Sequence, residues 1–328
     1  MIRAGATGVG SLPGTDPVEA ARVVLGELPE LPHLPELPAR GAHADLGGRG
    51  TALLVDLPAD LQPSGWRLVP RPSRDGRRAR DLLRRDLDAL EEVADAVGVP
   101  PAVKLQATGP WTLAALLELP RGERVLSDPG AVDDLAASLA EGLREHLADA
   151  ARRLPGAELV LQLDEPSLPA VLAAQVPNAS GAGRLRAPDA ARAAQVLERV
   201  LAVHPGTVVH CCAPHPPVPL LRRAGAAAVS LDALLLTPDD DEPLGEAVEA
   251  GTRLLLGLVP AVGPAPGTEK EVLAPVVALW RRLGLDLATV PDAVTVTPSC
   301  GLAGASPARA RDVLSAVRAA GARLDDLA

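Results

Sequence analysis

The stretch TVVHCCAPHPPVPLLRRAGAAAVSLD (Thr207–Asp232) contains one complete unit of the predicted fold. Two short apolar runs, Thr207–Cys211 and Ala227–Leu231, flank an amphipathic segment at Val218–Ala224. Short apolar runs that alternate with helical patterns are typical of parallel strands joined by helices. The stretch therefore predicts a strand, a helix and a second strand parallel to the first.

The same alternation extends over the whole chain. The predicted strands are Arg3–Val9, Ala52–Asp56, Ala102–Gln106, Glu158–Leu163, Thr207–Cys211, Ala227–Leu231, Arg253–Leu258 and Ala293–Thr297. The predicted helices are Pro17–Leu28, Arg77–Val97, Ala131–Leu154, Ala187–Val203, Val218–Ala224, Pro243–Ala250, Glu269–Leu283 and Pro307–Leu324. Eight strands, each followed by a helix, predict an α/β fold of the (β/α)8 TIM-barrel type, as a single domain over residues 1–328.

A doubly wound open sheet is the main alternative to the barrel. Such a sheet usually carries a Gly-rich turn after an early strand. The stretch GATGVGSLPG (Gly5–Gly14) is rich in glycine but lacks the spacing of a dinucleotide fingerprint. The Pro-rich stretch LPELPHLPELPARG (Leu28–Gly41) predicts a semi-extended surface segment and not a domain linker.

Composition excludes several classes of partner. The net charge of −10 leaves no basic excess for nucleic acid or for an acidic membrane surface. The basic stretch RDGRRARDLLRRD (Arg74–Asp86) alternates arginines with aspartates at helical spacing, which predicts a solvated helix face. No apolar run is long enough for a membrane span, and three cysteines fit a reducing cytosol, so we expect a cytoplasmic protein.

Residues whose side chains can bind a metal or take part in catalysis follow the predicted strands. In a barrel of this type, reactive side chains lie at the carboxyl ends of the strands, where the loops converge. The residues at these ends are Ser11, Asp164, Glu165, His210, Cys211, Cys212, Asp232 and Cys300. This convergence predicts that one rim of the barrel carries the active site.

A metal site is the first interpretation of the histidine and the cysteines. The two-residue period of a strand turns His210 and Cys212 to one face and Cys211 to the other. Cys300 and Asp232 complete a four-ligand set suited to zinc. The alternative is a group of separate rim residues that bind no ion. Cys211 fits a core residue, His215 fits a surface loop, and a vicinal disulfide between Cys211 and Cys212 would be strained.

Two further segments offer polar groups to a substrate. In LQLDEPSLP (Leu161–Pro169), Asp164 and Glu165 point to opposite sides, so one of them could hold an ammonium group or accept a proton. Capping of a following helix is the alternative. In GSLPGTDP (Gly10–Pro17), backbone amides could bind a carboxylate, or the segment forms only a turn and a helix cap.

Taken together, these segments resemble the cobalamin-independent methionine synthase family, specifically its C-terminal catalytic barrel. The matching stretches are VGSLPGT, SGW, VKLQATGPWTL, QLDEPSLP, VHCCAP, AVSLD and VTPSCGL, in the family's order over the whole chain. The resemblance implies Zn²⁺ as cofactor, with His210, Cys212 and Cys300 as ligands and Asp232 where the family usually has a glutamate. It also implies that Asp164 binds the amino group of homocysteine and that Ser11 binds its carboxylate.

The chain departs from the family at three places. We expect no separate N-terminal barrel on the folate side. The E-x-x-R-N-D box is not recognisable, and HADLGGRG (His43–Gly50) occupies its place with Asp45 as a stand-in for substrate binding. The family's proton-donating histidine after the seventh strand is missing from LLLGLVPAVGP (Leu254–Pro264). These departures concern the methyl donor, which is either a methylfolate or a methylcorrinoid carried by a corrinoid protein.

The resemblance implies an enzyme, a methyltransferase that moves a methyl group to the thiol of homocysteine and forms methionine. One alternative is methyl transfer to another thiol. A decarboxylase on a related barrel is a second, but it needs no His-Cys-Cys set. A non-catalytic protein that binds zinc or a thiol is the third.

Overall fold

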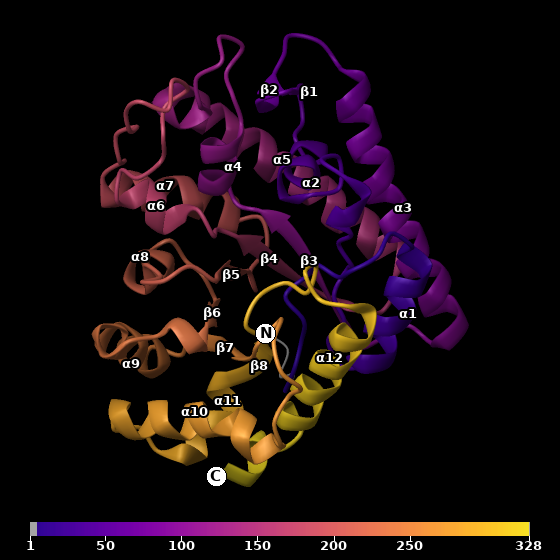
Figure 1. Ribbon diagram of the computed structural model, residues 1–328, viewed down its shortest axis with the longest axis vertical. Coiled ribbons are helices and arrows are strands. Elements are labelled where there is room, and N and C mark those ends of the chain that lie inside the picture. Colours follow the sequence, from indigo (N-terminus) through magenta and orange to yellow (C-terminus); the bar gives the residue numbers. More distant parts are fainter. Residues whose placement is uncertain (1–4, 328) are drawn as a thin grey trace.

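A six-stranded parallel sheet forms the centre of the computed structural model, which describes residues 5–327. Its strand order is β3-β4-β5-β6-β7-β8, so each strand lies beside the strand that precedes it in the chain. The strands are β3 (Ala102–Thr108), β4 (Glu158–Asp164), β5 (Val208–Cys211), β6 (Ala228–Asp232), β7 (Arg253–Val259) and β8 (Val294–Pro298). The sheet is curled, and helices surround it (Figure 1).

The helices cover the outer face of the sheet. They are α1 (Pro17–Glu27), α2 (Leu46–Ala52), α3 (Arg74–Val97), α4 (Pro110–Leu116), α5 (Pro129–Arg153), α6 (Leu168–Leu172), α7 (Ala190–Leu201), α8 (Val218–Arg223), α9 (Asp241–Glu249), α10 (Glu269–Leu283), α11 (Val290–Ala293) and α12 (Pro307–Gly321). Side-chain caps define where several of them begin, as Asp128 does for α5 and Ser306 for α12. Their buried Leu, Val and Ala side chains join one core with the strands, and this apolar burial is the main stabilising contribution.

Two extended segments, residues 5–12 and 31–37, lie between the two edges of the sheet. They form isolated parallel bridges instead of ladders: Ala6 with Val296 of β8, Ser11 with Glu36, and His33 with Lys104 of β3. Backbone hydrogen bonds therefore continue from β8 through both segments to β3. Proline lacks an amide donor, so the repeated prolines of residues 29–38 limit the pairing of segment 31–37 to single bridges.

The predicted strands are confirmed for the six that form the sheet, and the α/β class with them. The predicted strand Ala52–Asp56 is wrong, because Ala52 ends α2 and Asp56 has a φ of 56°. Residues 3 and 4 of the predicted strand Arg3–Val9 lie outside the described residues, and its remainder contributes the bridge at Ala6. The Pro-rich stretch is extended as predicted, but residues 31–35 are buried and not at the surface.

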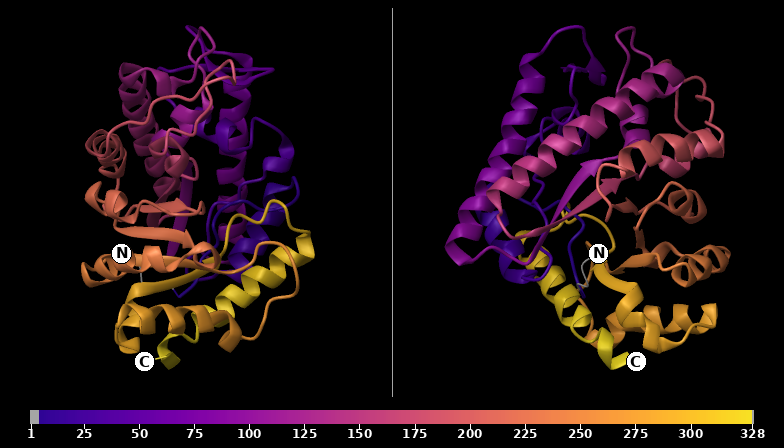
Figure 2. Two further views of the ribbon diagram at one scale, coloured as in Figure 1. Left: turned by 60° about the vertical axis from the view of Figure 1, so that its left-hand side comes forward. Right: turned by 180° about the vertical axis from the view of Figure 1, so that it is seen from behind.

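A two-stranded hairpin precedes the six-stranded sheet in the sequence. The hairpin of β1 (Ala59–Gln62) and β2 (Gly65–Leu68) lies between α2 and α3 in sequence. The long helices α3 and α5 lie on the outside of the structure (Figure 2). The solvated face predicted within α3 is correct for Asp81 and Asp88 but wrong for Asp86, which is only 2% exposed.

Within residues 5–327, no helix has both the length and the apolar character needed to cross a bilayer.

Candidate metal centre and substrate-binding site

Three predicted metal ligands come together at one edge of the sheet. His210 lies in β5, Cys212 follows that strand, and Cys300 lies two residues after β8. One ligand atom from each of the three lies within 4.8 Å of the other two, and the two sulfur atoms are 3.4 Å apart. The curl of the sheet makes this possible, because β5 and β8 are separated by two strands in the sheet order.

The imidazole of His210 has one ring nitrogen that is held by a partner and one that is free to bind an ion. His210 is 3% exposed, and its Nδ1 lies 2.9 Å from the hydroxyl oxygen of Ser230 on β6. Its Nε2 is buried and has no hydrogen-bond partner among the residues that the structure describes. A metal-binding histidine commonly has its second ring nitrogen held by such a partner. A buried nitrogen without a partner, beside two thiols, fits a soft divalent cation.

The two thiols have different affinities for a proton. Interactions with the Cys212 thiol and the His210 imidazole lower the pKa of the Cys300 thiol to about 4, although burial acts in the opposite direction. The hydrogen bond to Cys300, together with burial, raises the pKa of Cys212. These shifts favour ionisation of Cys300 over Cys212, and the thiolate is the form that binds a metal. Cys211 is fully buried, and burial raises its pKa to about 11, as expected for a core cysteine.

Asp232, the predicted fourth ligand, lies at the end of β6 on the same edge. Its Oδ1 accepts a hydrogen bond of 2.9 Å from the Leu234 amide and caps the 3-10 helix η3 (Ala233–Leu235). Burial raises the pKa of Asp232, with a further increase from Cys300 and a decrease from His210. The Asp232 carboxylate therefore interacts electrostatically with Cys300 and His210. It does not belong to the group of three residues whose ligand atoms lie within 4.8 Å of one another.

Asp164 lies next to the metal cluster at the end of β4. It is opposite His210 in the register of β4 and β5, and it is 7% exposed. Its Oδ1 accepts a hydrogen bond of 2.7 Å from Gln162 Nε2. Burial raises the pKa of Asp164, while His210, Lys104 and this hydrogen bond lower it. A buried carboxylate with one remaining free face can bind a cationic group.

Ser11 reaches the same place from the extended segment 5–12. A Cβ placed on Gly301 would clash with the Ser11 hydroxyl oxygen, so this hydroxyl lies against the residue next to Cys300. The Leu302 amide also donates a hydrogen bond of 2.7 Å to the Ser11 carbonyl oxygen. The hydroxyl of Ser11 is therefore positioned between the metal cluster and the second extended segment.

Glu36 is a candidate site residue that the sequence patterns did not reveal. It bridges to Ser11, and its Oε2 would lie 3.3 Å from a Cβ placed on Gly10. Burial raises its pKa to about 7, with Arg49 lowering it and Asp164 raising it. Glu36 and Asp164 are therefore close enough to interact electrostatically. Glu36 was missed because it belongs to the Pro-rich stretch that predicted a surface segment.

Asp45 has a different position from the other predicted site residues. It caps α2, because its Oδ1 accepts a hydrogen bond of 2.8 Å from the Gly48 amide. No described contact connects it to Ser11, Asp164 or the metal cluster, so its role in substrate binding stays a prediction.

Lys104 is a buried lysine that interacts electrostatically with the carboxylates of both Glu36 and Asp164. The Nζ of Lys104 donates hydrogen bonds to the Val9 carbonyl, at 2.8 Å, and to Gln162 Oε1, at 2.6 Å. Burial lowers the pKa of Lys104 to about 7, while Asp164 and Glu36 raise it. Lys104 and Gln162 thus form a hydrogen-bonded chain that ends on Asp164 and fixes the orientation of its carboxylate.

Glu165, the neighbour of Asp164, faces the helix layer. Its two oxygens accept hydrogen bonds from the Trp111 amide at 2.9 Å, and from the amide and the hydroxyl of Thr112, both at 2.7 Å. These amides belong to the first turn of α4, so Glu165 caps that helix and does not face the site.

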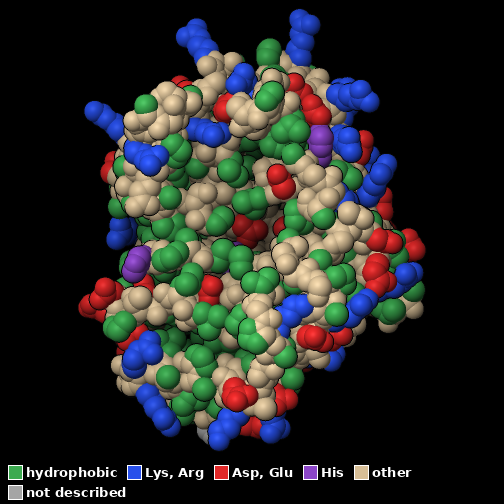
Figure 3. Space-filling view, in the orientation of Figure 1, with side chains coloured by type: hydrophobic (Ala, Val, Ile, Leu, Met, Phe, Trp, Pro, Cys, Tyr) green, Lys and Arg blue, Asp and Glu red, His purple; other side chains and the backbone are tan. Residues whose placement is uncertain are grey.

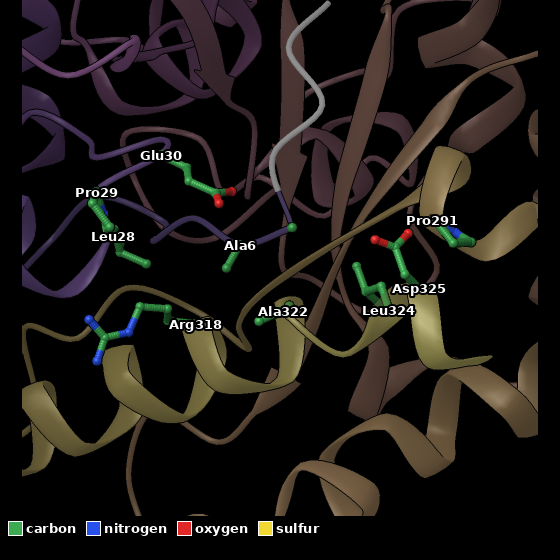
Figure 4. Close-up of a pocket in the computed structure, with 11 residues that line it drawn as sticks. Ala6, Leu28, Pro29, Glu30, Pro291, Arg318, Ala322, Leu324 and Asp325 are labelled. Atoms are coloured by element: carbon green, nitrogen blue, oxygen red, sulfur yellow. The ribbon is translucent and has the colours of Figure 1, made fainter. Parts of the chain in front are cut away.

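The surface agrees with this location. Figure 3 shows acidic side chains exposed in a hollow near the middle of the face, with hydrophobic side chains around it. A separate cavity of about 530 Å³ is lined by Ala6, Leu28, Arg318 and Leu324, among others (Figure 4). It lies at the amino ends of the strands, and no histidine or cysteine lines it. The chemically competent side chains therefore belong to the opposite edge.

Comparisons with known proteins identify similar sequences and structures. The family model described as the catalytic domain of cobalamin-independent synthase matches residues 4–323. No protein with a curated description matches the sequence. A solved B12-independent methionine synthase from Shewanella sp. W3-18-1, in complex with selenomethionine, is 14% identical with a TM-score of 0.65, and the alignment covers 98% of each chain. A methyltransferase from Methanosarcina mazei is 18% identical with a TM-score of 0.56, over 95% of this chain and 86% of that one.

Proposed function

The chain belongs to the cobalamin-independent methionine synthase family and is a methyltransferase, and on that premise we propose that it methylates the thiol of homocysteine at a zinc site to form methionine. One observation carries the proposal most directly. The cluster of His210, Cys212 and Cys300 lies beside Ser11 and Asp164, which supports a thiol-binding metal site next to groups that can anchor an amino acid.

The proposed metal site uses His210, Cys212 and Cys300, with Asp232 as the fourth ligand. A zinc ion bound there would hold the substrate sulfur as a thiolate at neutral pH, which is the nucleophilic form. Asp232 is the ligand best able to give up its place, because it also serves as a helix cap and lies outside the tight group of three.

The amino-acid end of the substrate is held by this chain's own polar groups. The carboxylates of Asp164 and Glu36 pair with the ammonium, and the Ser11 hydroxyl donates to the substrate carboxylate. Lys104 and Gln162 keep Asp164 in place from below. These contacts orient the sulfur toward the donor, and such positioning accelerates a transfer between two bound molecules.

In the transfer, a lone pair of the substrate sulfur forms the new S–CH3 bond. The bond between the methyl group and the donor breaks, and its electron pair leaves with the donor. We keep both a methylfolate and a methylcorrinoid as candidate donors. The loop that follows β7 has no histidine at residues 260–268. This loop therefore offers no imidazole that could donate a proton to the methyl donor.

We also propose that the fold is a complete (β/α)8 barrel in one domain. The extended segments 5–12 and 31–37 would take the first two strand positions. Their bridges to β8, to each other and to β3 support this interpretation.

A metal analysis with an activity assay tests the proposal. We expect about one zinc per chain and methionine formation from homocysteine with one of the two donors. Cys212→Ser should reduce both zinc content and turnover by more than about tenfold, because it removes one anionic ligand. Cys211→Ser is the matched control, since the adjacent thiol faces the core, and it should retain zinc. Full activity in Cys212→Ser would exclude the metal mechanism.

Methyl transfer to another thiol remains the alternative acceptor chemistry. A comparison of homocysteine with thiols that lack the amino group separates the two possibilities. A higher kcat/KM for the thiol without an amino group would contradict the proposed acceptor.

A further inference from the structure

A buried chain of charges connects the proposed substrate site to helix α3. Glu36 lies 3.2 Å from Arg49 Nε, and Arg49 Nη1 lies 2.9 Å from Asp86 Oδ2. Both oxygens of Asp86 also lie 2.8 Å from Arg40. Exposed fractions of these side chains are 13% for Glu36, 5% for Arg49, 1% for Asp86 and 11% for Arg40. Four charged side chains thus alternate in sign away from the site.

Stability alone does not account for this chain of charges. Desolvation of buried ion pairs costs about as much as their attraction returns, and well-packed apolar residues often serve a core equally well. Asp86 lies on a helix whose other carboxylates at positions 81 and 88 are exposed to solvent. The inward position of Asp86 is explained by its partners Arg40 and Arg49.

The position of Arg49 is fixed by the helix that carries it. Arg49 lies in α2, between Gly48 and Gly50. A Cβ on Gly48 would overlap the backbone at Ala42 and His43, and a Cβ on Gly50 would clash with Leu113. These close contacts fix the position of α2 against its neighbours. With Asp86 on one side of its guanidinium and Glu36 on the other, Arg49 has little freedom to turn.

Glu36 needs such a partner in order to act as an anion. The charged groups that face it are Arg49, Asp164, Lys104 and Asp86. Two of these are carboxylates, and Lys104 is hydrogen-bonded to Val9 and Gln162 and not to Glu36. Among the described residues, Arg49 is the cation that makes an ion pair with the Glu36 side chain. Removal of Arg49 would leave the Glu36 carboxylate free to rotate beside Asp164.

We propose that Arg49, held by Asp86, is a positioning residue that fixes the Glu36 carboxylate for the substrate ammonium and so makes the site select an amino-acid thiol. The inference rests on the proposed function, because it assumes that the acceptor carries an ammonium group. Arg49 touches no substrate in this arrangement. It acts through Glu36 alone.

The test measures selectivity for the amino group. Binding of L-homocysteine and of 4-mercaptobutanoate, the same molecule without its amino group, is measured by titration calorimetry on zinc-loaded protein under reducing conditions. Arg49→Met should weaken homocysteine binding by about tenfold, the scale of one charge-assisted hydrogen bond. Binding of 4-mercaptobutanoate should change less than about twofold. Asp86→Asn should act in the same direction with a smaller loss.

Two controls separate positioning from general damage. Asp81→Asn, on the exposed side of the same helix, should leave both affinities unchanged. Arg49→Lys, which retains a cation, should recover part of the selectivity if Arg49→Met folds poorly. In a Glu36→Gln background, Arg49→Met should change homocysteine binding less than about twofold, because its route of action is already removed.

Three results would overturn the inference. They are an equal loss for both thiols, a loss that persists in the Glu36→Gln background, and unchanged selectivity in Arg49→Met. Failure of the proposed function has a different signature, since wild-type protein would then show no preference for homocysteine over 4-mercaptobutanoate. The two failures are therefore distinguished by the wild-type measurement.

Discussion

Asp164 and Glu165 are adjacent acids with separate tasks. The alternation of β4 turns Asp164 toward the metal cluster and Glu165 toward the first turn of α4. The residue pattern offered both possibilities, an ammonium-binding acid and a helix cap, and only the family resemblance assigned the first to Asp164. The cap was also expected for the helix that follows in the chain. Glu165 instead caps α4, whose first turn precedes it by more than 50 residues.

The burial of Glu165 predicts a pH dependence of stability. Burial raises its pKa from 4.5 to about 7, so the folded chain holds this proton more tightly than the unfolded chain does. The free energy of unfolding should therefore fall as pH rises from about 4.5 to 7 and then level off. Glu165→Gln should remove a part of this fall on the order of 3 kcal/mol.

Urea denaturation of zinc-free protein at pH 5, 6, 7 and 8 measures this effect. Glu145→Gln, on the exposed face of α5, is the control and should retain the wild-type pH dependence. If Glu165→Gln retains it as well, the assignment of this titration to Glu165 is wrong.

At the scale of elements, the six sheet strands were predictable because each is a short apolar run between helical patterns. Their ends agree with the sequence to within one or two residues. Segment 5–12 overlaps the predicted strand Arg3–Val9, whereas segment 31–37 was not predictable in the same way. Residues 31–37 have a proline in every third position, which hides a buried, bridge-forming segment behind the pattern of a surface loop. Glu36 was lost from the predicted site for this reason.

The sequence predicted that His210, Cys212 and Cys300 share one edge of the sheet, but it did not predict the residues behind them. The period of a strand turned His210 and Cys212 to one face, and this expectation depended only on β5. The contact of Asp86 with Arg40 and Arg49 depends on how α3 packs against α2 and the 3-10 helix at Pro38–Arg40. Helical spacing reports which residues share a face, but not which neighbour covers that face.

Packing of helix α5 against the end of α2 predicts a strong effect from a small substitution. A Cβ placed on Gly142 would overlap the Leu53 carbonyl oxygen, so the two backbones are in direct contact there. Gly142→Ala should destabilise the protein by about 1–3 kcal/mol, because a backbone contact cannot yield as a flexible side chain can. Denaturant unfolding measures the change.

Gly26 in α1 provides the matched comparison, since a Cβ there would meet no atom within 4 Å. Gly26→Ala should be neutral or stabilising by up to about 1 kcal/mol, through helix propensity alone. Equal effects of the two substitutions would show that the backbone contact at Gly142 does not limit packing.

At the scale of the whole molecule, the group formed by His210, Cys212 and Cys300 joins two distant parts of the chain. Cys212 and Cys300 are separated by 88 residues and come from the ends of β5 and the loop after β8. The connection from β8 through segments 5–12 and 31–37 to β3 depends on isolated bridges, and so it has fewer hydrogen bonds than the ladders of the sheet. An ion held at this edge would therefore restrain the carboxyl side of the sheet.

Removal of the ion should loosen the molecule in a defined place. An ion that binds only the folded chain at a thousand times its Kd stabilises it by about 4 kcal/mol. For a chain of this size we expect chelation to lower Tm by on the order of 5 °C. Hydrogen exchange should accelerate most at residues 208–212 and 296–302, which carry the ligands, and least in β3, which contributes none. Cys212→Ser is the control: its Tm and its exchange should not respond to chelator, and an equal response from this variant would show that the ion acts elsewhere.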